Sequence, residues 1–204
     1  MNIQHVLAKL RGTNSASPSA ASTQEKSQAF AELVRHFQGP LFGFLGRLGL
    51  AQAQAQDIAQ DTLLRAWTHM ESYQPERAEF STWLFTIARN LAFNAMARAS
   101  ARHEVAQTDE AMPEPESATE QLGPEQLLEL AQRKAQLVQA LRQLPMEERS
   151  VLALAYVQEL NLHAIAKIEG CTLAAVKTRL HRAKLKLRAL LDPTYSSSTK
   201  EASA

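Results

Sequence analysis

Apolar side chains recur every three or four residues through the first half of the chain, the spacing that gathers them on one face of a helix. One stretch begins near residue 28 and is disturbed at Pro40, one spans about 51–70, and one runs over about 81–102. The positions expected to be buried are Phe30, Leu33, Val34, Phe37, Leu41, Ala59, Leu63, Ala66, Trp67, Met70, Leu84, Ile87, Ala88, Leu91 and Ala95. This half of the chain predicts a small helical module.

The helical pattern stops where prolines interrupt a polar, acidic segment, and it resumes at Leu127. The chain therefore predicts an all-α fold in which two small helical domains are joined by a flexible acidic linker. Near the N-terminus, residues 12–23 are almost wholly Ser, Ala, Thr, Asn and Pro, too polar to bury. We expect a disordered leader at 1–27, helical domains at 28–103 and 127–191, the linker at 104–126 and a disordered tail at 192–204.

The charge is unevenly distributed, although the formal net charge is only +1. Residues 1–103 carry 10 Lys/Arg and 7 Asp/Glu, and residues 127–204 carry 12 and 7. Residues 104–126 carry 7 acidic residues and no Lys or Arg. Two mildly basic domains thus flank an acidic linker, which its own repulsion and its prolines should keep extended.

The composition excludes several classes of protein. A single cysteine, Cys171, excludes a disulfide framework and a cysteine-clustered zinc site, and no apolar run approaches the ~18 residues of a membrane span. The six histidines are scattered, and neither a Ser-His-Asp arrangement nor a glycine-rich phosphate loop occurs. We expect a cytoplasmic protein that is not an enzyme, needs no cofactor or metal and does not insert into a membrane.

The strongest local signal lies over residues 162–181. A short helix, a turn at Gly170 and a second helix that Thr172 can cap match the spacing of a helix-turn-helix motif. Ala166 and Val176 fall where the two helices would touch, and glycine tolerates the positive φ of the turn. In such a motif the second helix is free to enter the major groove of DNA.

The second helix of this motif is strongly basic. Between Gly170 and Leu191 it has no acidic residue. Its six cations are Lys177, Arg179, Arg182, Lys184, Lys186 and Arg188. This pattern favours contact with DNA. A solvated face of an ordinary helical hairpin and a helix lying on an anionic membrane stay open as alternatives.

Several short motifs in both halves belong to one known pattern. The C-terminal matches are Leu144-Pro145, Glu148-Arg149, Ile165-Ala166 and the run from Val176 to Ala183. The N-terminal matches are the run from Asp57 to Thr62, Arg65-Ala66-Trp67 and, more specifically, the run from Phe80 to Ala92. Together they cover about residues 28–102 and 135–191. In this order they resemble the sigma factors of bacterial RNA polymerase, in particular the extracytoplasmic-function group.

The resemblance implies a protein that binds core RNA polymerase and directs promoter-specific initiation by recognising −10 and −35 elements of promoter DNA. The residues implied to dock on the polymerase are Asp57, Gln60, Asp61 and Arg65. Those implied near the −10 element are Phe80, Ser81, Thr82, Trp83, Arg89, Asn90, Asn94 and Arg98. Those implied on the −35 recognition helix are Thr172, Ala175, Lys177, Thr178, Arg179, His181, Arg182 and Lys186. An anti-sigma factor is a common further partner in the family.

One stretch departs from the family pattern. Members usually follow the Arg-Asn-Leu motif with an acidic residue and a dense arginine cluster, whereas only Arg98 and Arg102 occur here. Fewer phosphate contacts predict weaker engagement of the −10 region. On spacing alone, Phe80 and Trp83 are also more typical of core residues. Two other functions stay open: a dimeric helix-turn-helix regulator that acts without polymerase, and a helical adaptor that has lost DNA binding.

Overall fold

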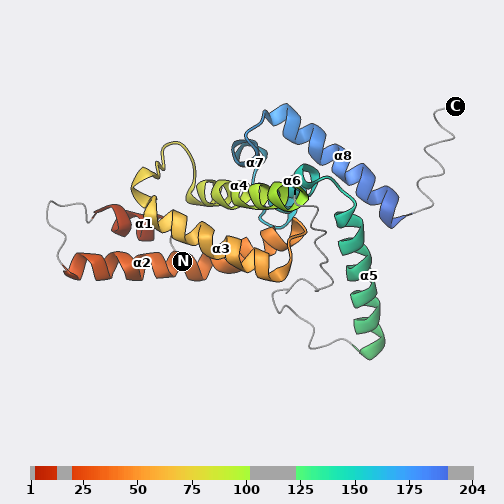
Figure 1. Cartoon of the computed structure of the whole chain (residues 1–204), viewed down its shortest axis with the longest axis horizontal. Coiled ribbons are helices and arrows are strands. Elements are labelled where there is room, and N and C mark those ends of the chain that lie inside the picture. The colour runs from red at the N-terminus through yellow and green to blue at the C-terminus, as the bar shows by residue number, and fades with distance from the viewer. Residues whose placement is uncertain (1–2, 13–19, 102–122, 193–204) are drawn as a thin grey trace.

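The structure is a computed structural model that describes residues 3–12, 20–101 and 123–192. Every regular element in these ranges is helical (Figure 1), which confirms the all-α prediction for this part of the chain. The N-terminal elements are α1 (Ile3–Gly12), α2 (Ala20–Arg47), α3 (Gln52–Thr68), the 3₁₀ helix η1 (Met70–Ser72) and α4 (Phe80–Ala101). The C-terminal elements are α5 (Pro124–Arg142), α6 (Met146–Tyr156), α7 (Leu162–Glu169) and α8 (Leu173–Leu191). Most of the expected linker and tail lies outside the described residues.

The N-terminal module forms because α2, α3 and α4 bury the apolar stripes that their sequences carry. These helices pack against one another in pairs, and their largest enclosed side chains include Leu41, Phe44, Leu84 and Phe85. The rings of Phe44 and Phe85 meet edge to face with centroids 5.4 Å apart, a favourable aromatic geometry.

The prediction of a disordered leader over residues 1–27 is wrong for two of its parts. Helix α1 packs on α2 and buries Val6, Leu7 and Leu10, which share one helix face. Helix α2 begins at Ala20 and continues through Pro40 without the expected break. The prediction rested on the polar composition of residues 12–23 and did not consider the apolar residues that precede this segment. Residues 13–19 lie outside the described part of the chain.

The C-terminal module consists of α5 to α8. Helices α6 and α7 both pack on α8, and this contact buries Val151, Leu154, Ile165 and Val176. Helix α5 also contacts α8. In Figure 1, α5 and α8 lie at the end of the molecule opposite α1.

The two modules pack directly against each other. Helix α4 lies along α7 and α2 lies along α6, so that buried side chains of both modules form one continuous apolar cluster. Gln158 Nε2 donates to the carbonyl of Pro40 (3.0 Å), and Lys167 Nζ donates to the carbonyl of Arg77 (2.5 Å). Gly49 has a φ of +85° and meets the Arg149 guanidinium so closely that a Cβ would collide with it.

Candidate nucleic-acid and polymerase interfaces

The turn between α7 and α8 has the geometry of a helix-turn-helix corner. Gly170 adopts φ +63°, and its N–H donates to the carbonyl of Lys167 while Cys171 donates to Ala166, a Schellman-type helix end. The Thr172 hydroxyl accepts from the N–H of Ala175 (3.2 Å), which caps α8 as predicted. Val176, fully buried, closes the joint between the two helices.

Helix α8 directs most of its cations outward. Val176 and Ala183 are buried and Leu180 and Leu187 pack beside them, as the apolar spacing predicts. Leu190, three residues after Leu187, is 38% exposed. The residues that are exposed on α8 include Lys177, Thr178, His181, Arg182, Lys184, Lys186 and Arg188.

Two cations predicted to contact the −35 element already have acidic partners inside the protein. Arg179 Nη1 lies 3.5 Å from Glu169 Oε2 and its side chain is 34% exposed. Lys186 Nζ lies 2.7 Å from Glu148 Oε1, which is mostly buried. The open part of the predicted −35 set is therefore the N-terminal half of α8, around Lys177 and Arg182.

Helix α4 separates the residues predicted near the −10 element into two groups. Asn90, Asn94 and Arg98 are exposed at four-residue intervals and thus share one outward stripe. Phe80 and Thr82 are each only 3% exposed, so neither side chain offers a surface to DNA in this structure.

An aromatic cluster explains the burial of Phe80. Its ring lies 5.4 Å from that of Phe37, 5.5 Å from that of Tyr73 and 5.6 Å from that of Trp83. Trp83 and Ser81 are half-buried. Helix α4 begins at Phe80, which turns the ring into the module and leaves Trp83 at the edge of the cluster.

Arg89 occupies the boundary between the two modules. Its guanidinium lies over the Phe93 ring (3.8 Å to the centroid), and Nη2 lies 3.2 Å from Glu169 Oε2 of α7. The Glu169 side chain is fully buried and also accepts a hydrogen bond from Ser150 Oγ (2.5 Å). Glu169 could not be identified from the sequence, because an acidic residue before a turn glycine does not indicate which side chains it contacts.

The polar face of α3 is open to solvent. Asp57, Gln60 and Arg65 are exposed, and Arg65 Nε pairs with Asp61 Oδ1 at 3.0 Å. An exposed pair of this kind stabilises a helix by about 0.5 kcal/mol at most. The face therefore contributes little to folding and is available for a partner.

An exposed apolar side chain that the sequence analysis missed lies on this face. Leu64 is 61% exposed, and Trp67, expected in the core, is 36% exposed with its ring 5.0 Å from that of Phe30. The sequence did contain an indication of this exposure: Leu64 directly follows Leu63, so it lies beside the buried stripe of α3 and not on it. Together with the polar residues, Leu64 and Trp67 give α3 an amphipathic outer surface typical of protein docking.

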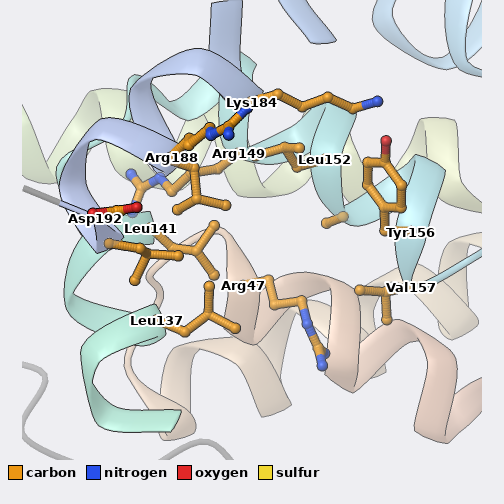
Figure 2. Close-up of a pocket in the computed structure, with 13 residues that line it drawn as sticks. Arg47, Leu137, Leu141, Arg149, Leu152, Tyr156, Val157, Lys184, Arg188 and Asp192 are labelled. Carbon is orange, nitrogen blue, oxygen red and sulfur yellow. The ribbon is translucent and has the colours of Figure 1, made fainter. Parts of the chain in front are cut away.

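A hollow of 610 Å³ opens between α5, α6 and α8 (Figure 2). Its apolar lining includes Leu137, Leu141, Leu152, Leu187 and Leu191. Its cationic lining is Arg47, Arg149, Lys184 and Arg188. Burial, with nearby Arg142, lowers the pKa of Arg149 from its ordinary value. The hollow therefore combines an apolar wall with a margin of four cations and one acidic residue, Asp192.

The described helices include none that is long and apolar enough to cross a membrane. Over the same ranges, His, Cys, Asp and Glu side chains form no group of three that would hold a metal ion.

Family models match both modules. Residues 33–102 match Sigma-70 region 2, and residues 134–187 match Sigma-70 region 4. The chain is 32% identical over 166 residues to the ECF RNA polymerase sigma factor RpoE of Cereibacter sphaeroides, covering 78% of this chain and 84% of that protein. It is 30% identical to SigW of Bacillus subtilis, an ECF RNA polymerase sigma factor, covering 78% and 87%.

Two solved structures share the fold at 24% identity. One is the sigma factor RpoE of Bartonella quintana in complex with the anti-sigma factor NepR, with a TM-score of 0.60 over 79% of this chain and 96% of that one. The other is CnrH in complex with the cytosolic domain of CnrY, with a TM-score of 0.61 over 92% and 97%. With the two family models in order along one chain, and with this helix-turn-helix corner, the protein belongs to the extracytoplasmic-function family of RNA polymerase sigma factors.

Proposed function

We propose that this sigma factor directs core RNA polymerase to promoters through four surfaces, one for each of the three predicted sets of residues and one at the hollow of the C-terminal module. The observation that carries the proposal is the capped, turn-preceded α8, whose N-terminal half presents Lys177 and Arg182 to solvent. A rigid corner of this kind can place the start of its second helix in the major groove.

The −35 contact is assigned to the first three turns of α8. Arg182 has the reach and donor geometry to contact a guanine edge, and Lys177 suits a phosphate. Thr178 and His181 extend the same exposed surface. Thr172 and Ala175 belong to the helix cap, where they hold the start of α8 in place.

The −10 contact is assigned to the outward stripe of α4, formed by Asn90, Asn94 and Arg98, with Trp83 at its start. Amide side chains suit base edges, and a half-buried indole can stack on an unpaired base. Since the arginines are fewer than is usual in the family, phosphate contacts at this surface should be weak.

Core polymerase is assigned two docking surfaces. The first is the face of α3 with Asp57, Gln60, Asp61 and Arg65, to which we add the exposed Leu64. The second is the hollow of the C-terminal module, whose apolar wall and basic margin are complementary to an amphipathic helix with acidic edges. Two surfaces far apart on the chain would fix both modules on one large partner.

An anti-sigma factor is a further expected partner, because the similar RpoE of Bartonella quintana was solved in complex with the anti-sigma factor NepR. We also expect the protein to act in the cytoplasm, where the polymerase is. Its role is to select promoters, and the catalysis belongs to the polymerase.

Reconstituted transcription tests the proposal. Purified core polymerase is incubated with genomic DNA with and without the protein, and start sites are sequenced. A set of new starts that share upstream elements at −10 and −35 is expected. No new start sites would refute the proposal. A symmetric footprint without polymerase would favour the dimeric regulator, and polymerase binding without promoter choice would favour the adaptor.

A further inference from the structure

We infer that Glu169 is an intramolecular latch that holds the two modules in a closed form and keeps one arginine of each away from DNA. The inference rests on the proposed function, since it takes Arg89 and Arg179 as members of the −10 and −35 sets. It concerns the free protein, before polymerase or promoter is bound.

The first step is the environment of the carboxylate. The Glu169 side chain is fully buried at the last residue of α7, where the helix dipole disfavours a negative charge. A buried charge requires close partners. Arg89 and Arg179 both lie against its Oε2 oxygen, at 3.2 and 3.5 Å, while Ser150 donates to Oε1. The carboxylate thus depends on a cation from each module.

The second step is that Glu169 and DNA compete for the same arginine side chains. A guanidinium that pairs with Glu169 in this way cannot at the same time make its full contacts with DNA. The Nε of Arg89 is buried and has no hydrogen-bond partner, so the closed form satisfies this side chain incompletely. Release of Arg89 would therefore cost less than the loss of a fully hydrogen-bonded side chain.

The third step is what keeps the interface closed in the free chain. Ala88 on α4 and Ile165 and Ile168 on α7 are buried in the one cluster that both modules share. The hydrogen bonds from Gln158 to Pro40 and from Lys167 to Arg77 join the modules at two further places. Opening exposes this surface, so a partner that binds only the separated modules must supply the free energy.

The latch is tested by Glu169→Gln, which keeps the size of the side chain but removes its negative charge. The new amide N–H groups can also face the N–H donors of the two arginines, an unfavourable contact. Glu125→Gln, an exposed acid on α5, is the matched control for charge. Small-angle X-ray scattering of the free chain should show a larger radius of gyration for Glu169→Gln only. Binding of a fluorescent 20-nucleotide single-stranded DNA of mixed sequence should tighten at least about fivefold, since apparent affinity follows the competent fraction.

A second variant keeps the test decisive if Glu169→Gln impairs folding. The double change Gln158→Ala and Lys167→Ala removes two further hydrogen bonds between the modules and leaves Glu169 in place. This variant should have a larger radius of gyration than the wild type, with unchanged helix content by circular dichroism. Unchanged size in all variants would overturn the latch and leave the promoter assignments intact. An enlarged chain with no gain in DNA binding would support the latch as a structural contact but overturn the masking of DNA contacts.

Discussion

Arg89 Nη2 on α4 lies 3.2 Å from Glu169 Oε2 on α7, although the two residues are 80 positions apart in the chain. This contact joins a residue predicted at the −10 element to the helix-turn-helix corner that precedes α8, the helix assigned to the −35 element. If Arg89 binds DNA as predicted, the arrangement of the two modules in the free protein is coupled to the availability of this side chain.

Lys177→Ala should weaken binding to promoter DNA in the polymerase complex by a similar factor for all sequences, because Lys177 is assigned to a phosphate. The slope of log affinity against log salt should become shallower by about 1. Titrations at several salt concentrations measure it. Lys134→Ala on α5, outside the assigned surfaces, is the control. An unchanged slope would remove Lys177 from the interface.

The pair of changes Asp57→Asn and Asp61→Asn should lower affinity for core polymerase at least about tenfold, a loss of ~1.4 kcal/mol. Thermal stability should change little, because the Asp61–Arg65 pair is exposed. Glu71→Gln, an exposed acid outside α3, serves as the control. Wild-type affinity for the double variant would show that α3 docks elsewhere or not at all.

Tyr156→Ser with Leu191→Ser should also weaken polymerase binding by about tenfold or more, because both side chains line the hollow and remain 56% and 44% exposed. An apolar side chain buried by a partner contributes ~1.5–3 kcal/mol. Leu128→Ser, 61% exposed on α5 and outside the lining, is the matched control. Equal losses in the variant and the control would argue against docking in the hollow.

Gly170→Ala should lower the free energy of unfolding by about 1–2 kcal/mol, since alanine is strained at a φ of +63° even though its Cβ meets open space. Gly39→Ala should instead raise stability by about 0.5–1 kcal/mol, because Gly39 lies within α2 and a Cβ there also contacts nothing. Chemical denaturation of both variants separates the two effects. A stable Gly170→Ala variant would contradict the left-handed turn.

Local patterns predicted the helices and the corner well. Ala59 and Ala66 on α3 are buried, as are Leu84 and Ala88 on α4, and Thr172 caps α8. Each of these features depends on residues a few positions apart. Spacing alone also favoured a core position for Phe80, and the aromatic cluster agrees with that interpretation over its assignment to DNA.

The contacts between modules could not be predicted, because they join residues far apart in the chain. Nothing in the sequence near Glu169 indicates Arg89 as its partner, or Arg149 as the neighbour of Gly49. The short helix α1 was missed for a related reason: Val6, Leu7 and Leu10 are buried by contact with α2, which lies further along the chain.

The most direct test of promoter recognition by α8 is transcription from a template library with randomised −35 bases, carried out with core polymerase and either the wild-type protein or Arg182→Ala. Sequencing the transcripts gives the preference at each position. We expect the variant to lose ~1–3 kcal/mol of preference at one base pair and to keep the rest. Identical preferences for the two proteins would contradict the assignment of α8 as the −35 recognition helix.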